Sequence, residues 1–146
     1  MAVELYHYIW VIAKNETPWP FYTSDAPVAA ISHTPGASPH SVDPAPLPDS
    51  HAEEAVKRLF SGRGDPSGLQ LIYPLTPQCA LAMYHPRDFA RDLGDKQGKV
   101  LVLGGESARI YNSAIAAHAT RQVLASSDDF AIARAVVQVQ AARGEV

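Results

Sequence analysis

The residues whose types and spacing could do chemistry lie close together in one polar turn, residues 23–28, which we call the elbow. It begins with Thr23, Ser24 and Asp25, which supply two hydroxyls and a carboxylate, and it continues to Pro27. Ser24 and Asp25 can hydrogen-bond to their own backbone, while Pro27 fixes φ and removes a donor, so a strand must turn here. The elbow therefore places polar groups at a sheet edge, where a ligand could bind or a carboxylate could act as acid or base.

Asn112 is the second residue that could take part, because it lies on the flank of a helix predicted over residues 106–120. Its amide could orient a substrate at the elbow, or it could satisfy loop carbonyls as a buried structural group. Asp25 likewise could bind a ligand, or it could have the structural role of capping a turn with its carboxylate. We predict that Asp25 and Asn112 lie together, either as ligand-binding groups with Thr23 and Ser24 or as a lock between elbow and helix.

Two further features have ordinary structural explanations. Cys79 could be a nucleophile if a histidine such as His7 or His85 lay beside it, but a strand cysteine is usually a small buried hydrophobe. Gly104 and Gly105 precede a predicted helix start, as in a phosphate-binding turn, yet further glycines and a following Lys-Ser or Lys-Thr pair are missing. A packing turn is the favoured interpretation.

The six histidines do not have the spacing of a metal site. His51 and Glu54 stand three residues apart on a predicted short helix, but no second His-rich element accompanies them. His118 falls on a predicted apolar stripe, where a core histidine is expected, and His33 and His40 are loop residues that could titrate near neutral pH. We therefore predict neither a metal ion nor a cofactor.

The composition is that of one ordinary globular domain over residues 1–146, with 47% hydrophobic residues. The net charge of −3 gives no general attraction to nucleic acid or to anionic membranes, so neither is expected as a partner. Cys79 is the single cysteine, which excludes an internal disulfide and agrees with a reducing compartment. Glu4 stands where a signal peptide carries basic residues. We expect a soluble cytoplasmic protein.

The periodicity predicts an α+β fold with a mixed, mostly antiparallel sheet of five or six short strands, and two C-terminal helices packed on one face. The predicted strands cover residues 3–13, 20–23, 28–31, 69–73, 79–84, 100–103 and 122–125. Helices are expected from about residue 49 to 60, over a short turn at 86–93, and over 106–120 and 130–142. Residues 33–50 contain five prolines and are expected to form a long surface loop.

Three of these elements carry sharper expectations. The strand at 3–13 is apolar on both faces and should be central, with residues 20–23 returning antiparallel to it. The strand at 100–103 is wholly apolar and should be buried. The helix at 106–120 should bury one stripe and expose the opposite one. The buried stripe consists of Tyr111, Ala114, Ile115 and His118, and the exposed one of Arg109, Ser113 and Thr120.

Three separated segments, taken in order, resemble the bacterial family known as domain of unknown function 4238. They are the elbow, the connector at residues 73–77 that leads into the strand from Cys79 to Met83, and Asn112 followed by residues 119–126. Members of that family begin with a His-Tyr-x-Pro-like segment, whereas His7-Tyr8 here lies too close to the elbow to be that motif. The resemblance thus implies that the chain corresponds to the C-terminal half of the family architecture.

Two functions remain open from the sequence. The first is a non-catalytic binding or interaction module, because strands that are apolar on both faces need a second cover. A homodimer, or a partner chain supplying the missing N-terminal half, would provide that cover. The alternative is a hydrolase-type enzyme for a small or nucleotide-like ligand, with Asp25 as the polar anchor and Ser24 and Asn112 as positioning groups.

Overall fold

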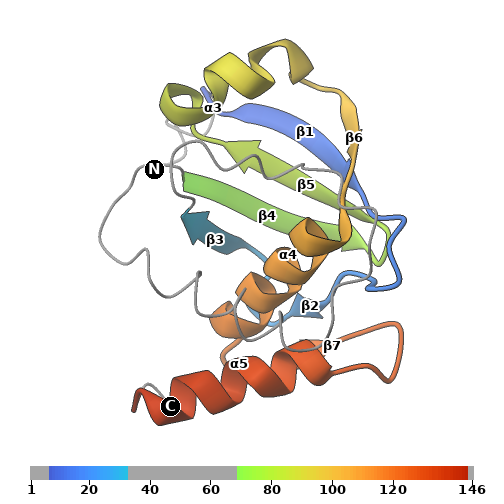
Figure 1. Ribbon diagram of the computed structural model, residues 1–146, viewed down its shortest axis with the longest axis vertical. Helices are drawn as coiled ribbons and strands as arrows, with labels where there is room; N and C mark the ends of the chain where they lie inside the picture. Colours follow the sequence, from blue (N-terminus) through green and yellow to red (C-terminus); the bar gives the residue numbers. More distant parts are fainter. Residues whose placement is uncertain (1–6, 33–68, 145–146) are drawn as a thin grey trace.

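The computed structural model describes residues 7–32 and 69–144, and their arrangement is shown in Figure 1. Five strands form one sheet in the order β3-β4-β5-β1-β6, and a separate two-stranded sheet pairs β2 with β7. The strands are β1 (Ile9–Lys14), β2 (Thr23–Ser24), β3 (Ala29–Ser32), β4 (Leu69–Thr76), β5 (Cys79–Tyr84), β6 (Val100–Val102) and β7 (Val123–Leu124). The helices are α3 (Pro86–Leu93), α4 (Gly105–His118) and α5 (Ala131–Ala142), with a 3-10 turn η1 (Gly94–Lys96) after α3.

The large sheet is antiparallel except where β1 runs parallel to β6. The α+β class and the mostly antiparallel sheet are therefore confirmed. A short hairpin joins β4 to β5, with a register shift between Pro74 and Thr76. The predicted connector at residues 73–77 is thus largely strand, because the ladder continues through this irregularity to the hairpin tip.

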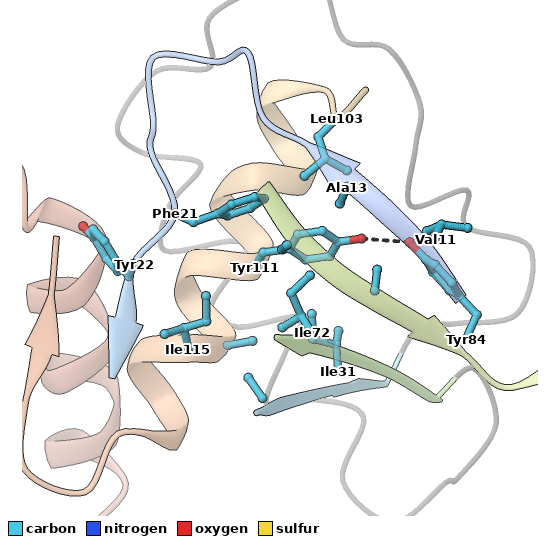
Figure 2. Packing of buried hydrophobic residues seen from close by; sticks show 14 of the residues in the cluster. Val11, Ala13, Phe21, Tyr22, Ile31, Ile72, Tyr84, Leu103, Tyr111 and Ile115 are labelled. Carbon is cyan, nitrogen blue, oxygen red and sulfur yellow. Dashed lines mark hydrogen bonds between the residues drawn. The ribbon is translucent and has the colours of Figure 1, made fainter. Parts of the chain in front are cut away.

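The core lies between one face of the large sheet and α4, as Figure 2 shows. Alternate strand residues point to the same face, so that Val11 and Ala13 of β1 and Ile72 of β4 enter this layer, each with no exposed surface. Tyr111 and Ile115 of α4 cover them from the helix side. In turn, α5 packs against α4 through Ile132 and Val136, on the side of the helix away from the sheet.

The prediction that α4 buries one stripe and exposes the other is only partly right: Tyr111, Ala114 and Ile115 are buried and Thr120 is exposed as expected, but three residues differ. Arg109 and Ser113, expected on the exposed side, are buried, and His118, expected in the core, is exposed. The reason is that α4 is covered on several sides, by the sheet, by the segment before β2 and by α5. A single-stripe reading of a helix fails when neighbours surround it.

Two strand expectations are also corrected. Residues 20–23 do not return antiparallel to β1, because β5 and β6 already occupy both edges of β1, and Thr23 and Ser24 pair with β7 instead. The strand near residue 100 is not buried: β6 forms an edge of the large sheet, and Val100 is 60% exposed. An interior position is confirmed for β1, which begins at Ile9: His7 and Tyr8, predicted as strand, form a turn, and residues 3–6 lie outside the described residues. The predicted loop at 33–50 and the predicted helix near 49–60 lie outside the described residues.

The face of the large sheet opposite α4 is also apolar. The strand register places Tyr73 of β4, Leu81 of β5, Ile12 of β1 and Val100 of β6 in one row across four strands. A second row joins Ala30, Leu71, Met83 and Trp10, in which Met83 is only 5% exposed and the other three are half-buried. We call these two rows the outer face. Tyr73 and Val100 are 38% and 60% exposed at opposite ends of the first row. The prediction that strands are apolar on both faces therefore holds for the four strands of each row.

Candidate functional site

Asn112 joins α4 to the segment that leads into the elbow. Its Nδ2 donates to the carbonyl of Pro20 over 2.9 Å, and its Oδ1 accepts from the backbone N–H of Tyr22 over 2.8 Å. Asn112 is 1% exposed, and the Tyr22 N–H lies in buried surroundings. Phe21, between these two residues, donates its N–H to the Pro77 carbonyl over 2.8 Å. The amide thus satisfies the backbone groups of Pro20 and Tyr22 on the other side of the segment, and both ends of the side chain are engaged by backbone.

Asp25 holds the chain that follows α4. Its carboxylate accepts a hydrogen bond from the Thr120 hydroxyl, a bond of 3.1 Å from the Thr120 N–H, and a long contact of 3.5 Å from the Gln122 N–H. These bonds, led by the one from the Thr120 hydroxyl, lower the pKa of Asp25 from 3.8 to about 2. The carboxylate is therefore ionised at neutral pH and acts as an acceptor that fixes the α4–β7 connection.

The other two elbow residues differ in their roles. The Ser24 hydroxyl donates to the Ala26 carbonyl over 2.8 Å and receives the Ala26 N–H over 3.2 Å, as expected for a serine in a turn. Thr23 is exposed and lines a cleft. Asn112 therefore holds the segment before β2, and Asp25, just after β2, holds the chain that follows α4. Thr23 lies on the open side.

The cleft beside Thr23 has a volume of about 300 Å³. It lies between the start of β2, the tip of the β4–β5 hairpin and the end of β7. Its walls are mostly apolar, its hydroxyls come from Thr23, Thr76 and Ser126, and Asp25 and Asn112 do not line it. Because none of the described residues that line it is charged, the cleft suits an uncharged group better than an ion.

The three segments that carry the family resemblance converge on this cleft. Thr23 comes from the elbow, Pro74 and Pro77 come from the connector, and Leu124 and Ser126 come from the stretch after α4. Sequence reasoning missed the cleft, because nothing in the chain indicates that the β4–β5 tip folds over the elbow. The closely spaced prolines at 74 and 77 were the available signal, since a short Pro-containing turn is often exposed and rigid.

A chain of buried polar side chains crosses the core beneath α4. Gln70 of β4 donates through Nε2 to the Tyr111 hydroxyl, and the hydroxyls of Tyr111 and Tyr84 lie 3.0 Å apart (Figure 2). Burial raises the pKa of Tyr111 to about 12 and the pKa of Tyr84 well above its usual value. These groups stay neutral at physiological pH, and their contacts with one another give them a structural role.

The start of α4 packs on Trp19. The Arg109 guanidinium carbon lies 4.7 Å from the centre of the Trp19 ring, and the ring approaches Gly105 closely enough that a Cβ there would lie 2.9 Å from it. This approach explains Gly105 as a packing residue. Gly104 is the N-cap of α4 with an extended backbone.

The remaining candidates are kept apart by the fold. Cys79 begins β5, whereas His85 follows its other end and His7 lies near that same far end, because Ile9 pairs with Tyr84. His85 instead caps α3 by accepting from the Arg87 N–H over 3.2 Å. Within residues 7–32 and 69–144, no group of three or more potential metal ligands comes together. His33, His40, His51 and Glu54 lie outside the described residues. In that same part of the chain, no helix has the length and hydropathy needed to cross a membrane.

Comparison with known proteins gives one match. A family model described as "Protein of unknown function (DUF4238)" matches residues 2–129. No curated protein and no solved structure was found to match. The match covers most of the chain, including the elbow, the β4–β5 hairpin and α4.

Proposed function

The chain belongs to the DUF4238 family of proteins of unknown function, and from that premise we propose that it is a non-catalytic binding or interaction module. One observation carries this proposal: Asp25 and Asn112, the best candidates for chemistry, use their polar atoms to bind the chain's own backbone. The large sheet, by contrast, exposes apolar side chains, among them Tyr73 and Val100. The prediction that the chain corresponds to the C-terminal half of a longer architecture stays a prediction.

The outer face is the surface we assign to this binding. Its first row runs without a break from Tyr73 to Val100, and both ends are exposed. In an antiparallel sheet one face is commonly solvated and polar, so an apolar second face calls for a cover. We infer that a second copy of the chain supplies it, in a cytoplasmic homodimer, and that a partner chain carrying the N-terminal half is the alternative cover.

Sedimentation velocity over a concentration series tests the homodimer. Val100→Glu places a charge on the outer face and should raise the dimer dissociation constant at least about tenfold, equivalent to about 1.4 kcal/mol. Val137→Glu is the matched control, since Val137 is 56% exposed on α5, away from the outer face. A wild-type chain that remains monomeric throughout, or equal effects of both substitutions, would contradict self-association through this face.

A ligand role for the elbow, with Thr23, Ser24, Asp25 and Asn112, is the second candidate, and the cleft beside Thr23 favours it. In its enzymatic form this candidate is a hydrolase acting on a small or nucleotide-like ligand. A thermal-shift screen with metabolites and nucleotides tests it, because a ligand at 100 times its dissociation constant adds about 2.7 kcal/mol of stability. Thr23→Val should abolish a shift that arises in the cleft, whereas the same shift in both proteins would place the ligand elsewhere.

A further inference from the structure

A second hollow lies on the side of the molecule opposite the sheet, where α4 ends and α5 continues. It is an open groove of about 580 Å³, formed by the end of α4, residues 119–123 and one side of α5. We call it the α4–α5 groove. Of the described residues, none that lines the groove also lines the elbow cleft or belongs to the outer face. The two hollows meet on β7, where Val123 lines the groove and Leu124 lines the cleft.

The groove has an apolar floor and polar rims. On α5, Ala133 and Val137 form one row at a spacing of four residues, and Arg134 and Gln138 form the adjacent row. Val137 is 56% exposed, so the floor is open to solvent. Arg121 and Gln122 line the groove from the chain that follows α4. The lining residues are Ala116, Ala119, Thr120, Arg121, Gln122, Val123, Ala133, Arg134, Val137, Gln138 and Gln140.

The charge of this groove is one-sided. Among the described residues that line it, two are arginines and none is acidic. Within residues 7–32 and 69–144, neither Arg121 nor Arg134 forms an ion pair. The Asp25 carboxylate lies next to Arg121, because it accepts hydrogen bonds from the backbone of Thr120 and Gln122, and the two exposed arginines outnumber this anion. They favour an anionic partner, and an arginine fork fits a carboxylate.

Neighbouring groups that would repel an anion are already engaged. The Asp25 carboxylate accepts from Thr120 and from the Gln122 N–H, and the Asp129 carboxylate accepts the Ala131 N–H at the start of α5 over 3.0 Å. The last carbonyls of α4 also have donors. Those of Ile115 and Ala116 receive the Ala119 N–H, and that of Ala117 receives Gln140 Nε2 over 3.1 Å. These hydrogen bonds turn the acceptors toward donors of the chain itself, while the Asp25 carboxylate keeps its negative charge.

We propose that the α4–α5 groove docks a short acidic peptide segment, with an apolar side chain over Ala133 and Val137 and carboxylates facing Arg121 and Arg134. The apolar floor favours a peptide over a bare inorganic anion, which would leave Val137 uncovered. The amides of Gln122 and Gln138 can pair with peptide carbonyls. This inference rests on the proposed function insofar as the chain acts by binding, but it does not depend on the homodimer.

Fluorescence anisotropy at low salt with a labelled peptide of alternating leucine and glutamate tests the groove. Wild-type protein should bind it saturably, and added salt should weaken the complex because exposed charges are screened. The double variant R121Q/R134Q should bind at least about tenfold more weakly, a loss of about 1.4 kcal/mol. R87Q/R91Q is the control, because it removes the same charge from α3, at the far end of the molecule from α5.

Each outcome decides the proposal. Loss of affinity in R121Q/R134Q alone supports it, as does loss when glutamine replaces glutamate in the peptide. The proposal is overturned if wild type shows no saturable binding, or if both double variants lose the same affinity. It is also overturned if inorganic phosphate, at the same concentration of negative charge, displaces the labelled peptide as well as the unlabelled peptide does. Val100→Glu should retain peptide binding, so failure of the outer-face dimer and failure of the groove give different results.

Discussion

Asn112 holds Tyr22 in place as a strand partner would: its Oδ1 accepts the Tyr22 N–H over 2.8 Å while its Nδ2 donates to the Pro20 carbonyl over 2.9 Å. One helix side chain therefore supplies two hydrogen bonds to a segment that has no ladder of its own. The position of β2, and with it the wall of the elbow cleft, depends on this amide.

Asn112→Ala should lower the free energy of unfolding by about 2–3 kcal/mol, since it leaves a buried N–H and a carbonyl without their partner. Urea denaturation measures this loss. Ser113→Ala is the control on the same helix: its hydroxyl donates to the Arg109 carbonyl over 2.8 Å, within one turn, and its removal should cost less than about 1 kcal/mol. Equal losses in the two variants would show that Asn112 is not a specific clamp.

The carboxylate of Asp25 should make stability depend on pH in acid. Its pKa is lowered from 3.8 to about 2, so its stabilising effect is fully present above pH 3.8 and is lost as the pH falls toward 2. Asp25→Asn removes the effect, and the difference in urea midpoint between wild type and variant should therefore shrink over that window. Asp92→Asn, an exposed position on α3, should leave the acid limb unchanged. A pH-independent difference for Asp25→Asn would contradict the Thr120 clamp.

Gly105→Ala should disturb the packing of Trp19, because the new Cβ would lie 2.9 Å from the indole ring. Trp19 is partly exposed and can shift, so we expect a cost of about 1 kcal/mol, at the low end for overpacking. The intrinsic tryptophan fluorescence should change as well. At Gly94 a Cβ would meet nothing within 4 Å, and Gly94→Ala should change neither stability nor fluorescence. Identical spectra for both variants would contradict the close contact.

Tyr111→Phe should weaken the core without creating a cavity. The variant loses the bond from Gln70 and the 3.0 Å contact with the Tyr84 hydroxyl, at a cost of about 1–2 kcal/mol in thermal or urea unfolding. Tyr73→Phe, on the exposed outer face, should stay within about 0.5 kcal/mol of wild type. If the two substitutions cost the same, the buried polar chain contributes nothing specific.

The sequence by itself determined those strands, helices and turns that short-range patterns of residues specify. Alternating and apolar runs predicted β1, β3, β4 and β5, the pattern after Pro86 predicted α3, and turn chemistry at Ser24 and Pro27 predicted the elbow. A buried structural role for Asn112, pairing with the backbone of a loop, was also predicted from the residues, because buried amides must be satisfied. The structure places its partners at Pro20 and Tyr22, just before the elbow.

Tertiary structure alone decided which elements meet. β2 pairs with β7 because β1 already has neighbours on both edges, and β6 is exposed because it ends the sheet. α4 is buried on more than one stripe because the sheet, α5 and the segment before β2 surround it. The apolar pattern of the helix sequence does not show how many neighbours the helix has. The elbow cleft and the α4–α5 groove likewise arise from segments far apart in the chain, and hydrophobic periodicity carries no information about such distant partners.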